Sequence, residues 1–316
     1  MKIYTPKSRE YVMTAKAQTN GQKLKHPIDK YIRKDSYPNI WCPGCGIGIA
    51  LQAFIKGVNI AEIEWNKVVV VSGIGCTGRV HMYLNTDCYH TTHGRPIPFA
   101  IGLKLMRPDL KVVVFSGDGD LFAIGGNHFI HAARRNMPIH VIAINNFNYG
   151  MTGGQGGPTT PTKAKSTTTP LGNYEHPFNI PSLAASCGAT YVSRWTTLDI
   201  RRLKFSIAES LQKDGFTCVE VISPCPVSYG KTNQIGDVCD EMTYYMEAEE
   251  LKPPNWFTYE ASNPDDISLG LKTKIPVGKF VDIDKKNFFD MYQEIYSDHH
   301  TKGRASLPTK TMEAEG

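Results

Sequence analysis

The chain has 316 residues, of which 41% are hydrophobic, so it can bury a substantial core. Its net charge of +5 is modest, and the basic residues near its start do not cluster with aromatic side chains, which argues against a nucleic-acid-binding surface. No apolar run approaches the ~20 residues that span a bilayer, and the start lacks the apolar core of a secretory signal. We therefore expect a cytoplasmic protein with neither a membrane nor a nucleic-acid partner.

Composition divides the chain into three parts. Residues 1–35 form a basic N-terminal arm, and residues 36–235 carry the strand signal and all of the motifs described below. Residues 236–316 form an extension in which the strand signal fades, with one short helix predicted over residues 286–296. We expect this extension to wrap the core or to contact a partner subunit.

The central part alternates between strand-like and helix-like segments. Apolar, β-branched runs predict strands over residues 67–73, 111–117, 139–146, 190–195 and 216–223. Such runs, without polar alternation, are typical of strands buried on both faces of a parallel sheet. Helical spacing predicts helices over residues 46–57, 121–135 and 198–213. The alternation predicts an α/β fold with a mostly parallel sheet flanked by helices.

Residues 151–170 interrupt this alternation, because they are rich in glycine, threonine and proline. We expect them to form a loop and not an element of the core. A loop of this length inside a compact domain is typically functional or disordered.

The sequence Ser116-Gly117-Asp118-Gly119-Asp120 lies directly between a predicted strand and a predicted helix. Its glycines allow a tight turn and a close approach of the backbone to a ligand, and the helix N-terminus offers unpaired amides to an anion. Asp118 supplies a hard carboxylate oxygen for Mg²⁺. On its own, this motif is equally compatible with an ordinary strand-to-helix turn.

A second polar pair ends the next strand. This pair is Asn145 and Asn146, and Asn146 comes 28 residues after Asp118. Because the carboxyl ends of neighbouring parallel strands meet at one edge of a sheet, we expect Asp118 and Asn146 to lie side by side. Their oxygens and a backbone carbonyl make a partial Mg²⁺ shell that phosphates and water can complete. The pairing resembles the signature of thiamine-diphosphate enzymes, in which Asp118 and Asn146 would bind magnesium and the carbonyl of Asn148 would add a ligand.

Eight cysteines are present, and Cys42 and Cys45 form a Cys-x-x-Cys motif. In a reducing compartment such pairs are typically metal or redox sites rather than disulfides. A thioredoxin-like dithiol would directly follow a strand, which is not predicted here, and a zinc site or an iron–sulfur cluster needs about four ligands. Cys76 and Cys225 are candidates for the other two, since each follows the end of a predicted strand. Spacing alone leaves zinc and iron–sulfur open.

Six motifs, in this order, resemble the β subunit of 2-oxoacid:ferredoxin oxidoreductases: WCPGCG, GIGCTGR, HGRPIPFAIGLKL, GDGDLFAIGGNHF, NNFNYGMTGGQ and SPCP. The resemblance covers about residues 37–235 and implies a thiamine-diphosphate-binding fold. In that family the four cysteines that match Cys42, Cys45, Cys76 and Cys225 hold one 4Fe-4S cluster close to the thiamine diphosphate.

The resemblance also assigns further residues to the site. Cofactor-binding positions would be Ile74, Gly75, Cys76, Thr77, His93, Gly119, Asp120, Gly150 and Met151. His93 would in addition be a catalytic residue. The stretch from Thr152 to Thr160 would be an active-site loop near the substrate.

The implied reaction converts a 2-oxoacid, coenzyme A and oxidised ferredoxin into an acyl-CoA, carbon dioxide and reduced ferredoxin. The thiamine ring is the electron sink, and the 4Fe-4S cluster removes electrons singly through a radical intermediate. Thiamine enzymes use a Glu from a separate domain to activate the aminopyrimidine ring, and no such domain is predicted here. We therefore expect activity only with an α-type subunit that supplies this Glu. Family members often also carry small γ and ferredoxin-like subunits.

The substrate is indicated by two stretches, MTGGQ and SPCPVSYGKTN, which resemble the 2-oxoglutarate members more than the pyruvate members. Gly153 stands where some broad-specificity relatives have Lys, and residues 156–158 depart from the usual form of the group. A pyruvate or branched-chain 2-oxoacid member of the same family is the alternative. A non-redox thiamine-dependent decarboxylase or carboligase subunit would have no reason to keep four clustered cysteines, and a zinc-binding module would leave the Asp118 and Asn146 pairing unexplained.

Overall fold

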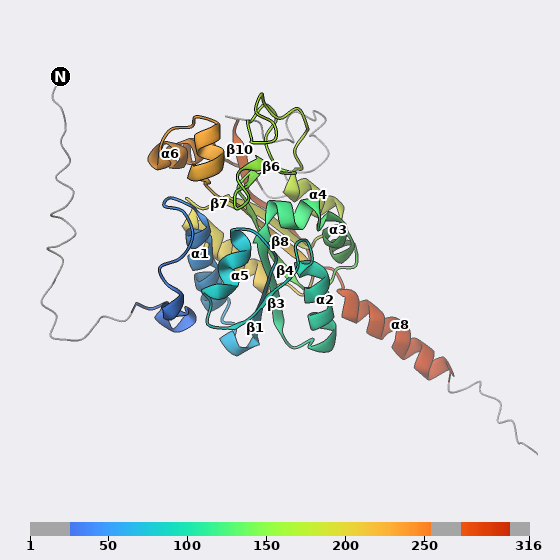
Figure 1. Ribbon diagram of the computed structural model, residues 1–316. Helices are drawn as coiled ribbons and strands as arrows, with labels where there is room; N and C mark the ends of the chain where they lie inside the picture. Colours follow the sequence, from blue (N-terminus) through green and yellow to red (C-terminus); the bar gives the residue numbers. More distant parts are fainter. Residues whose placement is uncertain (1–25, 254–272, 304–316) are drawn as a thin grey trace, which may run out of the picture.

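A computed structural model describes residues 26–253 and 273–303 (Figure 1). Its centre is an eight-stranded sheet in the order β2-β1-β3-β4-β8-β7-β10-β9. The strands are β1 (Val68–Ser72), β2 (Asp87–His90), β3 (Lys111–Gly117), β4 (His140–Asn145), β7 (Tyr191–Thr196), β8 (Thr217–Ile222), β9 (Glu249–Leu251) and β10 (Ile275–Asp282). Neighbours are parallel except β7 and β10. The predicted α/β fold with a mostly parallel sheet is therefore confirmed.

Helices cover both faces of this sheet (Figure 1). One face carries α1 (Ile47–Ile60) and α5 (Ile200–Gln212), and the other carries α2 (Pro96–Met106), α3 (Gly126–Arg134) and α4 (Ile180–Ser186). Two further helices are α6 (Val238–Ala248) and α8 (Phe288–Gly303), and α8 projects away from the body of the molecule (Figure 1). No described helix is long and apolar enough to cross a membrane.

The central strands are apolar because both of their faces are buried. In β1, Val68 and Val70 pack in the core beneath α1 and α5, whereas Val69 and Val71 pack in the core beneath α2 and α3. Each fully buried side chain of this size stabilises the fold by roughly 1.5–3 kcal/mol. The continuous valine run therefore reflects two separate cores that share one sheet.

Two expectations about the elements are wrong. The strand signal was expected to fade after residue 236, yet β10 joins the sheet beside β7. A bulge between Lys279 and Val281 brings Val281 to the same core as Phe280, opposite Ile275 and Val277, which breaks the alternation that marks a strand. The helix expected over residues 121–135 is divided into a π-helical turn, Gly119–Ala123, and α3.

The outer segments agree in part with the sequence. The predicted helix over residues 286–296 is present as the longer α8. Within the arm, residues 1–25 lie outside the described residues, and two short 3-10 turns, Asp29–Tyr31 and Lys34–Ser36, follow them. The division into an arm, a cofactor-binding part and an extension stays a prediction.

Two opposite charges are buried in the middle of the sheet. Arg194 of β7 and Glu220 of β8 are register partners, and each side chain is 1% exposed. Arg194 Nε donates to Glu220 Oε2 at 2.6 Å, and Arg194 also donates to the Asn179 side chain and the Pro276 carbonyl. Glu220 Oε1 accepts from Asn145 Nδ2 at 2.8 Å. The pair therefore links β10, β7 and β8 to the carboxyl end of β4.

Replacing Arg194 with Met should destabilise the protein by about 3–5 kcal/mol, because Glu220 would remain buried without its partner. The free energy of unfolding, measured by urea denaturation, tests this. The matched control is the double variant Arg194→Met with Glu220→Leu, which should recover most of the loss because no buried charge is left. A single variant as stable as the wild type would contradict this account.

Candidate functional site

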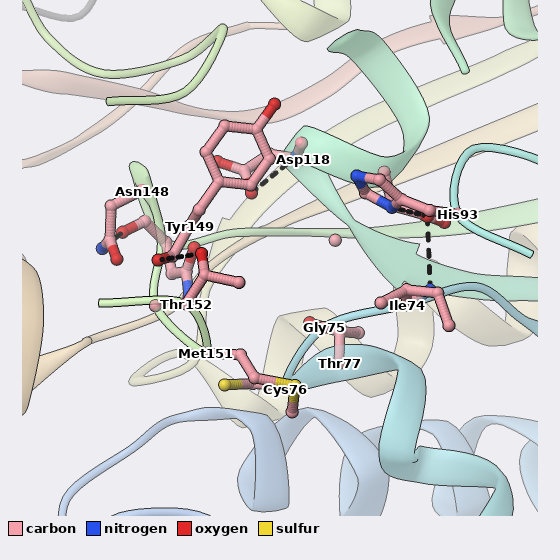
Figure 2. A pocket seen from close by; sticks show the side chains of 15 residues that line it. Ile74, Gly75, Cys76, Thr77, His93, Asp118, Asn148, Tyr149, Met151 and Thr152 are labelled. Carbon is pink, nitrogen blue, oxygen red and sulfur yellow. Dashed lines mark hydrogen bonds and ion pairs between the residues drawn. The ribbon is translucent and has the colours of Figure 1, made fainter. Parts of the chain in front are cut away.

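A cavity of about 610 Å³, counting the space that opens to solvent, lies beyond the carboxyl ends of β1, β3 and β4 (Figure 2). It is lined by Ile74, Gly75, Cys76, Thr77, His93, Gly117, Asp118, Gly119, Asp120, Asn146, Asn148, Tyr149, Gly150, Met151 and Thr152. Every residue to which the family resemblance assigns a cofactor or magnesium contact is in this set. The carboxyl edge of a parallel sheet is where ligands bind in open α/β folds.

The carboxylate of Asp118 is buried at this cavity, with 4% of the residue exposed. Its Oδ1 accepts a hydrogen bond from Gly119 N at 2.9 Å, and its Oδ2 accepts one from Thr159 Oγ1 at 2.5 Å. Burial raises the pKa of Asp118 to about 6, and no basic side chain of residues 26–253 or 273–303 pairs with it. A buried carboxylate without a counter-charge is suited to a bound cation.

The loop after β4 brings two asparagines to the same cavity. Asn145 Oδ1 accepts from Phe147 N at 3.1 Å, and Phe147 has a left-handed backbone with φ of +63°. Thr160 Oγ1 donates to the Phe147 carbonyl at 2.6 Å, and Asn148 Nδ2 donates to the Asn146 carbonyl at 2.7 Å. These bonds fix a tight turn that presents Asn146 and Asn148 beside Asp118, as the strand order predicted.

The carboxylate of Asp120 holds three segments together and is 2% exposed as a residue. Its Oδ1 accepts from the amides of Gly94 at 2.7 Å and Ile74 at 3.2 Å, and it lies 2.6 Å from His93 Nδ1 (Figure 2). Its Oδ2 accepts from Ser116 Oγ at 2.6 Å. Protein donors thus occupy both oxygens, so the carboxylate organises the cavity wall and orients the His93 ring.

Glycines shape the wall at positions where a side chain would intrude. A Cβ on Gly119 would lie 2.2 Å from the Tyr149 ring, which packs directly on this turn. A Cβ on Gly150 would meet Asn148 Oδ1 and Cys225 Sγ, each at 3.4 Å. Gly75 has φ of +109°, a conformation that favours glycine. The backbone therefore comes close to whatever occupies the cavity, as a diphosphate cradle requires.

A second cavity, of about 770 Å³ counting open space, is lined by Cys42, Cys45, Cys76 and Cys225. The two cavities share four lining residues: Cys76, Asn146, Gly150 and Met151. Figure 2 shows Cys76 and Met151 together at one end of the first cavity. The four cysteines that the resemblance assigns to one cluster are therefore gathered, and they adjoin the site with Asp118.

The thiols are close enough to affect one another. Burial, and then the neighbouring thiols, raise the pKa of Cys45 to about 12 and also raise the pKa of Cys76. All four thiols line the wall of the same open cavity.

Two contacts join the segments that carry these cysteines. Trp41 Nε1 donates to the Cys76 carbonyl at 2.8 Å, and Gly46 N donates to the Pro224 carbonyl at 3.4 Å. Both contacts flank the Cys-x-x-Cys turn, so the turn is tied to the loop after β1 and to the loop after β8. Cys42 is exposed, whereas Cys45, Cys76 and Cys225 are partly buried.

The stretch over residues 151–170 is ordered and partly packed. β5 (Asn148–Tyr149) and β6 (Gln155–Gly156) form a two-stranded hairpin, and Thr159 and Thr160 are each 1% exposed. The expectation that no part of it joins the core is wrong, because Ala164 is fully buried in the core beneath α1.

Sequence reasoning missed several residues that support the site. Glu220 and Arg194 could have been found, because each is a lone charge inside an otherwise apolar strand and the charges are opposite. Thr159, which donates to Asp118, had no signal beyond the composition of its loop. Tyr149 also lines the cavity and is not among the predicted site residues, whereas Thr152, another lining residue, begins the predicted active-site loop.

Comparisons with known proteins agree with this geometry. A family model described as "Thiamine pyrophosphate enzyme, C-terminal TPP binding domain" matches residues 73–221. The 2-oxoglutarate synthase subunit KorB of Methanocaldococcus jannaschii is 47% identical over 265 residues, which cover 84% of this chain and 95% of that protein. The 2-oxoacid:ferredoxin oxidoreductase subunit beta of a Sulfolobus species is 37% identical and covers 77% of this chain and 81% of that protein.

The chain belongs to the β-subunit family of the 2-oxoacid:ferredoxin oxidoreductases. A solved structure of this type is that of 2-oxoglutarate:ferredoxin oxidoreductase from Magnetococcus marinus, with 2-oxoglutarate, coenzyme A and succinyl-CoA bound. It is 28% identical, covers 92% of this chain and 98% of that chain, and has a TM-score of 0.73. As a member of this family, the β subunit carries a thiamine-diphosphate-binding domain and is part of a multi-subunit oxidoreductase.

Replacing Asp120 with Ala should lower the free energy of unfolding of the β subunit by at least about 3 kcal/mol, because four hydrogen bonds to a buried carboxylate are lost. Chemical denaturation measures this. The matched control is Asp120→Asn, in which Oδ1 keeps its three donors and the amide nitrogen can donate to Ser116. The free energy of unfolding should fall much less in Asp120→Asn than in Asp120→Ala. Equal losses in both variants would contradict the assigned network.

Proposed function

We propose that this β subunit acts in the oxidation of 2-oxoglutarate with coenzyme A and ferredoxin, which yields succinyl-CoA, carbon dioxide and reduced ferredoxin. The observation that carries the proposal is the shared wall between the cavity of Asp118 and the cavity of the four thiols. Relatives named as 2-oxoglutarate synthase subunits support the choice of substrate.

Magnesium would be held by the carboxylate of Asp118, the side-chain oxygen of Asn146 and the backbone carbonyl of Asn148. All three residues are 9% exposed or less and line one cavity. Carboxylate and amide oxygens are the ligands that Mg²⁺ prefers, and diphosphate oxygens and water would fill the remaining positions. The charge of the ion would offset the cost of burying Asp118, which otherwise raises its pKa.

Thiamine diphosphate would lie along residues that follow β1, β3 and β4. Residues of this wall are Ile74, Gly75, Cys76, Thr77, Gly119, Asp120, Gly150 and Met151. When bound, the cofactor supplies a carbanion for attack on the keto carbon and an electron sink for the loss of carbon dioxide. His93, which lines the cavity and is oriented by Asp120, would contact cofactor or substrate as the catalytic residue.

A 4Fe-4S cluster would be bound by Cys42, Cys45, Cys76 and Cys225. The four thiols line one cavity beside the Asp118 site, and a 4Fe-4S cluster is held by four thiolates. A non-redox thiamine enzyme would have no use for such a site next to its cofactor. The raised pKa values of Cys45 and Cys76 indicate that these thiols need positive charge nearby to ionise.

The active assembly would require an α-type subunit. The described cavity would supply the metal and diphosphate side of a thiamine site, and the pyrimidine-activating Glu would come from that partner. Ferredoxin would accept the electrons, and γ and ferredoxin-like subunits would complete the complex where they occur.

The test of this proposal is a substrate screen on the anaerobically purified complex with ferredoxin as the acceptor. We expect bound iron and sulfide, and reduction of ferredoxin that depends on 2-oxoglutarate and coenzyme A. Faster turnover with pyruvate or a branched-chain 2-oxoacid would favour the alternative members of the family. A zinc-loaded, colourless protein would overturn the redox assignment.

Replacing Asp118 with Ala should weaken the binding of thiamine diphosphate on the order of 100-fold or more, because magnesium loses its carboxylate ligand. Isothermal titration with and without a chelator measures this. Chelation should abolish the binding of thiamine diphosphate to the wild type and should change its affinity for the variant little. The variant should keep its iron and sulfide. The exposed Asp284→Ala serves as the matched control. Wild-type affinity in Asp118→Ala would refute the metal assignment.

Replacing Cys225 with Ala should leave thiamine diphosphate bound and stop the delivery of electrons to ferredoxin, because the cluster loses a ligand. Cofactor affinity and ferredoxin reduction are measured side by side. The control is Cys239→Ala, since Cys239 is exposed and lies outside both cavities. Normal ferredoxin reduction by Cys225→Ala would remove this cysteine from the ligand set.

A further inference from the structure

Helix α6 packs against the Cys-x-x-Cys turn and against the loop that carries Cys225. A capping box begins it, with Asp237 accepting from the amides of Cys239 and Asp240. Its first residue, Val238, lies so close to the Cys-x-x-Cys turn that a Cβ on Gly44 would be 2.2 Å from it. One turn later, the helix reaches the loop of Cys225. α6 therefore belongs to the surroundings of the thiol cavity although it lies outside every motif in the sequence.

Glu241 is the residue of α6 that meets this loop. It is 1% exposed, and its Oε1 accepts a hydrogen bond from the backbone amide of Cys225 at 3.0 Å. Gly230 packs against the same carboxyl group, so that a Cβ there would lie 2.8 Å from Oε2. The hydroxyl of Tyr245, which belongs to the same helix, lies beside this carboxyl group and favours its ionised form. The backbone amide of Cys225 is thus the group outside α6 to which the side chain is bound.

If Glu241 served only to fill space in the core, burying its carboxyl group would cost free energy of folding. Removing a carboxyl group from water carries a desolvation cost even when it is hydrogen-bonded, and an apolar side chain would fill the same space without that cost. The Glu241 side chain therefore needs a local role, and the structure offers one at the amide of Cys225.

We propose that Glu241 is a positioning residue for Cys225, an inference that rests on the proposed 4Fe-4S site. By accepting from the Cys225 amide, Glu241 fixes the turn from which the thiol reaches the cavity. It also keeps this N–H from donating to a sulfur of the cluster. Hydrogen bonds to the sulfurs are among the factors that set the reduction potential of a cluster. A donor stabilises the more negative, reduced form, so an engaged amide keeps the potential low.

The experiment compares three variants of the anaerobically purified complex by redox titration and by electron paramagnetic resonance of the reduced cluster. Glu241→Ala removes the acceptor and should raise the reduction potential and change the spectrum. Glu241→Gln keeps an acceptor oxygen and should restore a nearly wild-type spectrum and a potential closer to the wild type. Glu247→Ala is the matched control, because Glu247 is an exposed residue of the same helix. Thiamine diphosphate affinity should be unchanged in all three.

Loss of the cluster in Glu241→Ala with wild-type cofactor affinity would also support the inference, because the damage would be confined to the cluster. The inference is overturned if Glu241→Ala matches Glu247→Ala in potential and spectrum. It is also overturned if Glu241→Gln is shifted as far as Glu241→Ala, or if Glu241→Ala loses cofactor binding as well. A wild-type complex without iron and sulfide would overturn the proposed function itself, which the same measurements distinguish.

Discussion

The buried carboxylate of Asp120 is the interaction on which the site depends. It ties the end of β3, through Ser116, to the loop that follows β1 and to the loop that carries His93. The packing around it is tight, because a Cβ on Gly73 would lie 1.8 Å from Oδ2. Since an unpaired buried carboxylate is costly, all of its donors must be in place together. The cavity wall therefore forms as one unit, and a shift of any one of these segments would move the others.

The direction of the strands explains why the proposed magnesium ligands and the thiols lie together. β1, β3, β4 and β8 are parallel, so the segments that follow them emerge at the same edge. Asp118 follows β3 and Asn146 follows β4, whereas Cys76 follows β1 and Cys225 follows β8. Only Cys42 and Cys45 arrive from a segment before the sheet, and Trp41 ties that segment to Cys76. The parallel strands thus assemble residues that are up to 149 positions apart in the chain, from Cys76 to Cys225.

The sequence predicts those parts of the fold and of the site in which a short stretch of residues carries the whole pattern. A valine run buried on both faces, or an Asp between two glycines after such a run, is visible in a short window. β10 was missed because the bulge before Val281 hides its alternation, and the edge of the sheet relaxes the demand for apolar residues. Thr159 and Glu241 were missed for a different reason. Each acts through one long-range contact, with Asp118 and with Cys225, and no local pattern records a contact of that kind.

The arrangement has a consequence for electron transfer within the proposed function. Cys225 Sγ lies 3.9 Å from Asn148 Oδ1, and a Cβ on Gly150 would contact both atoms at 3.4 Å. The separation between the magnesium loop and the cluster ligands is therefore set by packing inside one chain. Within the proposed function, the metal, the diphosphate and the electron acceptor would all lie at one edge of the sheet of this chain, which would leave the activation of the pyrimidine to the partner.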